Sequence, residues 1–242
     1  MKSFSVVIAL VVLTSGCATQ QPQHPTFKLS DFRSSTLKEL PYDSPPQTIY
    51  RIDDHRFVTL ERYRDCNHGE SYYNDTRTGI RKYLGRGRFE NFQGRIINAD
   101  PTGMNIVLPL AYPPRAFCGN GEKGCVVPFW YSTDGGRTFL IEDYADHSFR
   151  PFDDSKNYTF VATKEKLYIA EKSAGNDAYV VEYPMIYGVD LSRPYPPGIK
   201  GDSFAASKRP QFLRGIFTPF GQDRITCDSS LKPTNPDAPL VQ

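Results

Sequence analysis

The sequence predicts an all-β fold, and three observations lead to that prediction. Short runs of aromatic and β-branched residues recur from about Thr48 onward. Turn-forming residues separate these runs at short intervals, as in chains built from antiparallel hairpins. No window of the chain has the apolar repeat of an amphipathic helix. About ten antiparallel strands are expected, arranged as a small or incomplete propeller-like fold, with a β-sandwich as the alternative.

The first strands are expected within residues 56–84. Residues 56–63 have a period of two, because Val58 and Leu60 alternate with polar neighbours, and such alternation gives a strand one apolar and one polar face. Residues 71–75 and 80–84 flank a short turn and are expected to form a hairpin.

The next pairing is expected around a turn rich in conformational signals. Residues 94–99 and 104–110 flank Asp100–Gly103. In that turn Pro101 presets one φ angle and Gly103 allows a positive one. We therefore expect the two flanking segments to pair as a hairpin.

The remaining strands follow the same alternation of apolar runs and turns. They are expected at residues 126–132, 138–144, 158–163, 167–171 and 178–183. The spacing groups the strands into blades near residues 56–84, 94–145 and 158–190, after which the chain becomes rich in Pro and Gly.

The turn at residues 132–139 carries a motif. Its sequence, Ser-Thr-Asp-Gly-Gly-Arg-Thr-Phe, fits the Asp-box pattern S-x-D-x-G-x-T-[FW] of sialidases and other β-propellers. The Asp134 carboxylate is expected to accept hydrogen bonds from turn amides, and Gly136 to allow a left-handed φ. A carbohydrate-active enzyme would need further boxes, and only one is present. The box is therefore interpreted as a folding device made by Ser132, Asp134, Gly136, Thr138 and Phe139.

The N-terminus has the pattern of a bacterial lipoprotein signal peptide. Lys2 supplies the positive start, and residues 6–13 form an apolar run too short to span a bilayer. Small residues then precede Cys17, so cleavage after Gly16 and acylation of the Cys17 sulfur and amine are expected. At roughly 0.8 kcal/mol per buried methylene, three acyl chains make the attachment effectively permanent. Ala18, in place of Asp, favours the outer membrane.

These signals divide the chain into four segments. Residues 1–16 are the signal peptide, and residues 17–47 are the lipidated cysteine followed by a flexible tether rich in Gln, Pro, Ser and Thr. Residues 48–232 form the β-rich domain, and residues 233–242 a disordered tail. The formal net charge of +2 gives no electrostatic case for binding nucleic acid or an anionic membrane. The lipid anchor is expected to supply the membrane attachment.

The cysteines downstream of the lipidation site are even in number, which favours disulfides in an oxidising compartment. Cys118 and Cys125 bracket a Gly-rich loop and are expected to pair. Cys66 and Cys227 then form a long-range bridge, which stabilises the domain by about 2–5 kcal/mol. A metal site using Cys66 and His68 is the alternative, but no second pair of ligands accompanies them. We expect neither a metal nor another cofactor.

The chain lacks the usual catalytic motifs. Neither G-x-S-x-G, H-E-x-x-H nor a P-loop occurs, and every histidine is isolated in the sequence. The pairs Asp53-Asp54 and Asp153-Asp154 lack the spacing of a calcium loop and are expected to cap turns. The sequence therefore predicts a protein that is not an enzyme.

Basic and aromatic residues are interleaved between residues 81 and 95. Arg and aromatic side chains are enriched at protein interfaces, so this segment is the predicted partner-binding region. The simpler interpretation is a solvated basic strand pair with its aromatic side chains in the core. The residues expected to contact a partner are Arg81, Arg86, Arg88, Phe89 and Arg95.

Several ordered blocks of the sequence resemble the enterobacterial lipoproteins that act as immunity proteins against type VI secretion lipase effectors. The blocks are residues 50–57, 72–76, 92–95, 98–103, 131–139, 147–149, 151–152 and 177–183. The resemblance covers residues 45–190. It implies a lipoprotein on the periplasmic face of the outer membrane that binds a secreted phospholipase or lipase effector and blocks it. It transfers no inhibitory residue, so the interface stays open.

Two other classes of protein remain as alternatives. An envelope scaffold or assembly lipoprotein shares the anchor and the β-fold, and a carbohydrate-active protein shares the Asp-box. A lipase gene beside this one favours the immunity function, whereas turnover of sialosides or other glycosides favours the enzyme.

Overall fold

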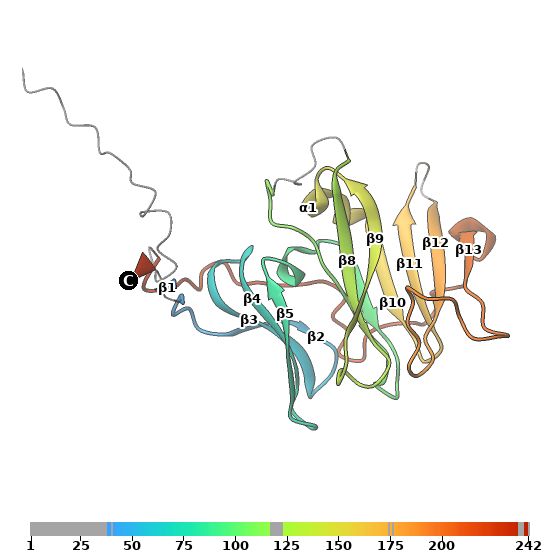
Figure 1. Cartoon of the computed structure of the whole chain (residues 1–242), viewed down its shortest axis with the longest axis horizontal. Helices are drawn as coiled ribbons and strands as arrows, with labels where there is room; N and C mark the ends of the chain where they lie inside the picture. Colours follow the sequence, from blue (N-terminus) through green and yellow to red (C-terminus); the bar gives the residue numbers. More distant parts are fainter. Residues whose placement is uncertain are drawn as a thin grey trace, which may run out of the picture. The chain divides into compact units, whose positions relative to one another are not determined.

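The computed structural model describes residues 38–39, 41–116, 123–173, 175, 177–236 and 240–241, and nearly all of their regular structure is β (Figure 1). The all-β prediction is therefore confirmed. The signal peptide, Cys17 and Cys118 lie outside the described residues. No helix in the described chain has the length and apolar character needed to cross a bilayer.

The chain divides into a small unit made by its two ends and a main unit, Glu39–Pro239. The strands of the main unit are β2 (Gln47–Arg51), β3 (Arg56–Asp65), β4 (His68–Asp75), β5 (Ile80–Arg86), β6 (Arg95–Asn98), β7 (Ile106–Pro109), β8 (Cys125–Ser132), β9 (Leu140–Ser148), β10 (Tyr158–Ala162), β11 (Lys166–Lys172), β12 (Ala178–Pro184) and β13 (Asp202–Ala205). The helical turns are η2 (Phe89–Asn91), α1 (Pro151–Asp154), η3 (Ser155–Asn157) and η5 (Ala206–Lys208). Two further strands, β1 (Lys38–Glu39) and β14 (Leu240–Val241), pair with each other.

The described strands of the main unit form three sheets. The first is the meander β2-β3-β4-β5, and the second is β7-β8-β9. The third has the order β13-β12-β11-β10-β6. The predicted hairpins at β4-β5, β8-β9 and β10-β11 are all present as antiparallel pairs.

The predicted hairpin between β6 and β7 is wrong. β6 leaves its neighbour in sequence and pairs in parallel with β10, with Ile96 beside Phe160. Side-chain hydrogen bonds from Asn98 connect β6 to β7, although the two strands share no backbone ladder. The Asn98 side-chain amide accepts from the Val107 N–H at 2.7 Å and donates to the Val107 carbonyl at 3.0 Å, taking the place of a backbone partner. The turn between the two strands therefore joins two sheets.

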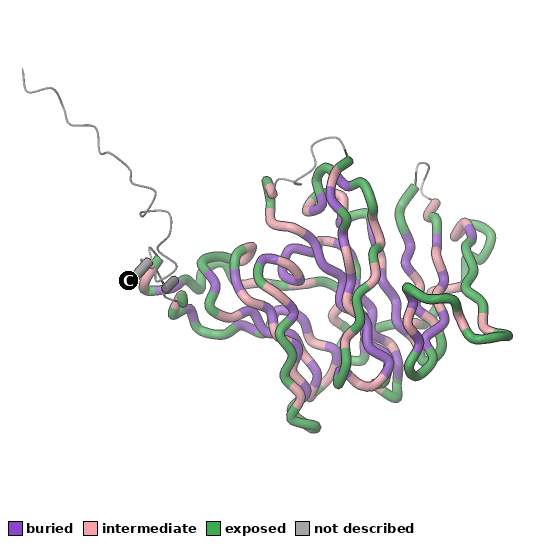
Figure 2. The backbone as a smooth tube through the Cα atoms, in the orientation of Figure 1, coloured by how far each residue is buried: buried purple, intermediate pink, exposed green. Residues whose placement is uncertain are grey.

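The core lies where the three sheets meet, and it is rich in aromatic rings. Tyr50 of β2, Phe129 of β8 and Phe160 of β10 are all fully buried. The Phe129 and Phe160 ring centroids are 5.4 Å apart, and Phe92 meets Phe160 edge to face at 5.6 Å. Figure 2 shows buried residues running along the strands and exposed ones at the turns. This shared core makes the three sheets one packed body.

A C-terminal segment, residues 218–228, closes the outer edge of β2. We call it the C-terminal strap. The Phe220 N–H donates to the Ile52 carbonyl at 3.0 Å, and the Thr226 N–H donates to the Ile49 carbonyl at 2.8 Å. The strap thus satisfies backbone groups that an edge strand would otherwise expose.

The strap also ties the first sheet to the third. The Ile96 N–H of β6 donates to the Asp223 carbonyl at 2.8 Å. At the other end of the strap Cys227 forms the predicted disulfide with Cys66, in the turn between β3 and β4, across 161 residues of sequence. Cys125 is disulfide-bonded. Its predicted partner Cys118 is outside the described residues, so that pairing stays a prediction.

The tether and the tail are shorter than expected. The Ser44 hydroxyl accepts a hydrogen bond from the Tyr63 N–H at 2.9 Å, so the folded part begins before residue 48. The Asp43 carboxylate accepts from the Thr234 N–H at 2.7 Å and from the Asn235 N–H at 3.3 Å. Residues 233–236 are therefore held by the N-terminal edge of the domain.

Candidate functional site

The Asp-box forms the turn between β8 and β9 and is organised by side-chain oxygens. The Ser132 hydroxyl donates to the Asp134 carboxylate at 2.8 Å and accepts from the Gly136 N–H at 2.9 Å. The Asp134 carboxylate also accepts from the Thr138 N–H at 2.9 Å. Burial opposes ionisation of Asp134, but these hydrogen bonds outweigh it and lower the pKa of the carboxyl below its usual value. Every polar group of the box thus serves the turn.

Two apolar contacts fix the Asp-box turn onto the first sheet. Gly136 has a φ of +83°, and a Cβ there would overlap the Tyr73 ring. Phe139 meets Tyr73 edge to face with ring centroids 5.3 Å apart. The position therefore requires glycine for two reasons, its φ and the closeness of the ring.

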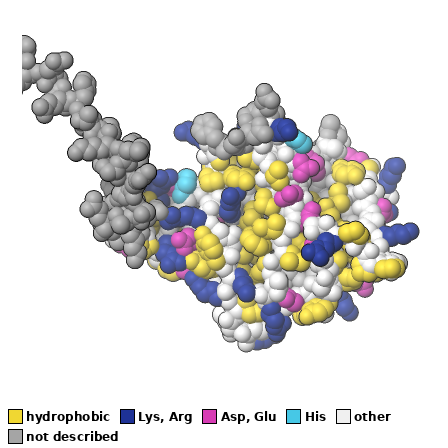
Figure 3. Space-filling view, viewed as in Figure 1, with side chains coloured by type: hydrophobic (Ala, Val, Ile, Leu, Met, Phe, Trp, Pro, Cys, Tyr) yellow, Lys and Arg dark blue, Asp and Glu magenta, His cyan; other side chains and the backbone are white. Residues whose placement is uncertain are grey.

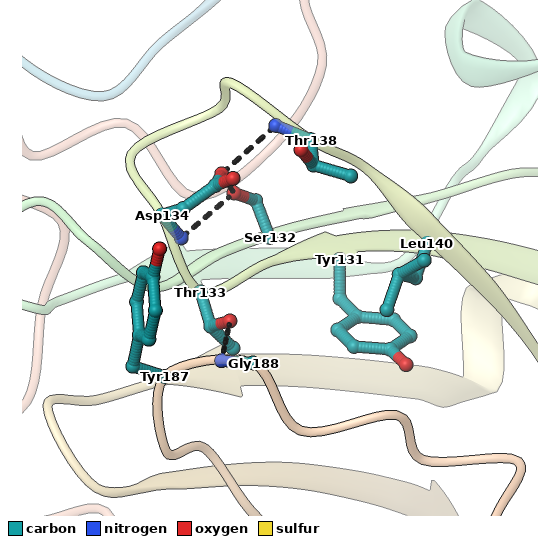
Figure 4. Close-up of a pocket in the computed structure, with 8 residues that line it drawn as sticks. All are labelled: Tyr131, Ser132, Thr133, Asp134, Thr138, Leu140, Tyr187 and Gly188. Carbon is teal, nitrogen blue, oxygen red and sulfur yellow. Dashed lines mark hydrogen bonds between the residues drawn. The ribbon is translucent and has the colours of Figure 1, made fainter.

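A small cavity of about 180 Å³ opens beside the Asp-box (Figure 4). Tyr131 and Leu140 lie on one side of it, and Tyr187, which is 80% exposed, stands on the other. The Thr133 hydroxyl accepts from the Gly188 N–H at 3.0 Å and holds the loop that carries Tyr187. Ligand pockets for small molecules usually enclose 300–1,000 Å³, so this cavity is small for a sugar site.

A larger polar cavity of about 570 Å³ lies where four of the ordered sequence blocks come together. The His55 ring reaches the Asp75 carboxylate at 2.9 Å and lies 3.6 Å from Asp53. Arg56 forms an ion pair with Asp53 at 2.6 Å and packs against Gly103. These four charged or titratable groups are paired with one another, and the two carboxylates also hold turns together.

The predicted partner-binding residues do not form one patch. Arg81 lies on β5 and makes two hydrogen bonds to Glu61, at 2.9 and 2.8 Å. Its guanidinium also stacks 3.9 Å from the centre of the Tyr72 ring. The hydrogen bonds to Glu61 raise the pKa of Arg81 above its usual value. This cation is already satisfied within the first sheet.

The other four residues of the predicted set differ in position. Arg86 is exposed at the end of β5, and Arg88 stacks 4.2 Å from the centre of the Tyr112 ring. Phe89 is fully buried beside Tyr50, so its inclusion was wrong. Arg95 is on β6, in the third sheet, where it pairs with Asp223 of the strap at 2.8 Å.

The metal alternative fails for a chemical reason. Cys66 is in the disulfide with Cys227, so it has no thiolate to offer a metal. His68 instead contacts Asp65 at 2.7 Å. Among the residues that the structure describes, no three His, Cys, Asp or Glu side chains are grouped to hold a metal ion.

Sequence reasoning missed the solvent face of the β8–β9 hairpin. Val126, Pro128 and Trp130 alternate with buried residues along β8, yet they are partly or well exposed. Ile141 of β9 lies directly opposite Trp130 and is 48% exposed. The signal was present in the sequence as an unbroken apolar run from Cys125 to Tyr131, which puts apolar side chains on both faces of the strand.

Comparison with known families gives one clear result. Residues 42–171, more than half of the chain, match a family model described as T6SS Tli3 immunity protein. The match spans the first sheet, the Asp-box hairpin and the start of the third sheet. A comparison with curated proteins gave no match.

Proposed function

We propose, because the chain belongs to the Tli3 family of type VI secretion immunity proteins, that it binds a secreted lipase effector directly and tightly and so neutralises it. The family match over residues 42–171 is the observation that carries this proposal. Family membership implies protection against an effector by a protein that is not itself an enzyme. The lipase target comes from the resemblance of the sequence blocks to lipase-effector immunity lipoproteins.

We further propose that the protein acts from the periplasmic face of the outer membrane. The sequence basis is the lipoprotein signal peptide with Cys17 as the acylated residue and Ala18 behind it. The Cys66–Cys227 disulfide supports an oxidising compartment. A phospholipase delivered into the periplasm attacks this membrane system, so the anchor keeps the inhibitor where its target works.

The site chemistry supports a binding function. The Asp134 carboxylate is engaged by turn hydrogen bonds, and His55 lies between two carboxylates that also cap turns. A protein that neutralises an enzyme one-to-one needs a broad complementary surface in place of such reactive groups. A stable complex of this kind buries about 1,600 Å² in total.

The proposal is tested with a soluble chain from Ala18 to Gln242, which keeps every described residue. It should abolish phospholipid hydrolysis by its cognate lipase effector, to be sought as the product of a neighbouring gene, at an equimolar ratio. A lipase from a different effector family serves as the control and should stay active. Full activity of the neighbouring lipase at several-fold molar excess would reject the immunity function in favour of an envelope scaffold.

The anchor is tested separately in cells. Replacing the acylated residue, Cys17→Ser, should reduce protection against the delivered effector, because the protein then stays near the inner membrane on its uncleaved signal or is misplaced. A purified Cys17→Ser chain that begins at residue 17 should inhibit as well as the soluble chain from Ala18. Full protection by Cys17→Ser in cells would show that the anchor is dispensable.

A further inference from the structure

The β8–β9 hairpin presents an apolar face to solvent. Side chains two residues apart on β8 share a face, and the register places Trp130 opposite Ile141 and Pro128 opposite Asp143. Val126 is 46% exposed and Ile141 48%. We call Val126, Pro128, Trp130, Ile141 and Asp143 the β8–β9 outer face. Figure 3 shows hydrophobic side chains gathered over the middle of the molecule, where Figure 1 places these two strands.

Trp130 is held in place at the end of this face. Its indole N–H donates to the Leu84 carbonyl on β5 at 3.2 Å, and its ring meets Phe139 edge to face at 6.5 Å. A tryptophan fixed in this way loses little conformational entropy when a partner covers it. Such preorganised aromatic residues are the side chains that dominate binding energy at interfaces.

Carboxylates border the outer face along β9. Asp143 and Asp146 are exposed on β9 and make no ion pair with any residue in the described part of the chain, whereas Glu142 lies opposite the buried Phe129 and so belongs to the other face. Burial and the neighbouring Asp146 raise the pKa of Asp143. Figure 3 shows acidic side chains next to the hydrophobic ones. The border of the face along β9 is therefore negative.

Two arginines, one on β5 and one just after it, contrast with this border. Arg81 is paired with Glu61, and Arg88 is stacked on Tyr112, whose hydroxyl donates to the Val126 carbonyl at 3.3 Å. These basic groups have partners inside the protein, whereas Asp143 and Asp146 form no ion pair with any described residue. Charge on an edge strand also prevents edge-to-edge aggregation, but that role does not need an exposed apolar face beside it.

We propose, resting on the proposed function, that the β8–β9 outer face docks onto the bilayer-facing surface of the lipase effector. An enzyme that works on phospholipid in an anionic bilayer needs an apolar surface bordered by Lys or Arg. An apolar face bordered by carboxylates complements such a surface, because apolar side chains meet apolar side chains and carboxylates meet basic groups. Docking there covers the surface through which the lipase meets its substrate.

The test uses the soluble chain from Ala18 to Gln242 and the neighbouring lipase. Ile141→Asp should weaken binding at least about 100-fold, because a charge enters the centre of the interface. Asp143→Lys should weaken it about 10-fold, with the largest loss at low salt. Matched controls are Tyr179→Asp, at a strand residue that is 52% exposed in the third sheet, and Glu165→Lys, at an exposed turn. Both controls should bind like the wild type.

The outcomes separate this proposal from the proposed function. If the wild-type chain neither binds nor inhibits the lipase, both the immunity function and the docking surface are wrong. If it binds and the folded Ile141→Asp and Asp143→Lys variants bind equally well, only the docking surface is wrong. The wild-type protein could instead be a dimer that Ile141→Asp converts to a monomer while lipase binding is unchanged. That result would assign the face to a second copy of the chain and would overturn the docking proposal. Circular dichroism confirms that each variant is folded.

Discussion

The edge strand β2 is closed by the C-terminal strap, whereas the edge strand β9 is left open. Along β2, strap amides donate to the Ile49 and Ile52 carbonyls, and Gln222 accepts from the Arg51 N–H at 2.8 Å. In the described chain β9 pairs only with β8, and it carries the exposed Asp143 and Asp146.

The two edges use different means to avoid unwanted strand pairing. The β2 edge is protected by the strap, which bonds to its backbone groups and is tied to the first sheet by the Cys66–Cys227 disulfide. The β9 edge is protected by negative charge, which repels a second copy of the same edge and attracts a partner of opposite charge. The closed side therefore stabilises the domain, and the open side is available for recognition.

The largest expected effect concerns the closed side. Cys227→Ser should lower the free energy of unfolding by about 2–5 kcal/mol, because the unfolded chain without the cross-link has a higher conformational entropy. Urea denaturation under non-reducing conditions measures this change. Cys66→Ser and the double variant should match it, and lipase inhibition by the folded protein should be unchanged. Loss of inhibition without loss of stability would show that the closed side contacts the lipase.

The second effect concerns the turn that joins the strands of the open side. Asp134→Ala should cost about 1–3 kcal/mol, since the Thr138 amide and the Ser132 hydroxyl lose their acceptor. Asp134→Asn keeps one carbonyl acceptor and should cost less. Thermal unfolding measures both variants. Partner binding well below the melting temperature should survive, so a binding defect at unchanged melting temperature would contradict the structural role of the Asp-box.

The smallest effect separates stability from recognition on the open side. The raised pKa of Asp143 means that its ionisation opposes folding as the pH rises above its usual value of 3.8. Asp143→Asn should therefore stabilise the neutral-pH protein slightly, by no more than about 0.5 kcal/mol, and this gain should vanish in acid. Lipase binding should become weaker at the same time. A variant that gains stability and keeps full affinity would limit Asp143 to edge protection.

Much of the strand pattern was predictable because it is local. The alternation around Val58 and the turns at the β4-β5, β8-β9 and β10-β11 hairpins depend on neighbouring residues alone, and the structure contains all of them. The Cys66–Cys227 bridge followed from the number of cysteines and one short loop. Local rules of this kind carry over from sequence to structure.

The errors share a non-local cause. A turn sequence such as Asp100–Gly103 suits a hairpin. It does not reveal that the Asn98 side chain bonds to β7 in place of a backbone ladder, or that β6 pairs with β10. Phe89 sits among arginines in sequence, yet the η2 turn directs it into the core beside Tyr50. The strap has little strand character of its own and becomes ordered through β2, which lies about 170 residues away.

The closure of β2 by the strap also sets the order in which the molecule can fold. The first sheet is made from the beginning of the chain, but its edge waits for the last segment to be synthesised. Contacts of such long sequence separation slow folding, because the chain must close a large loop before it gains them. Until then a nascent chain exposes the β2 backbone to other chains. A truncation before residue 218 should leave a molecule that aggregates while its aromatic core is already formed.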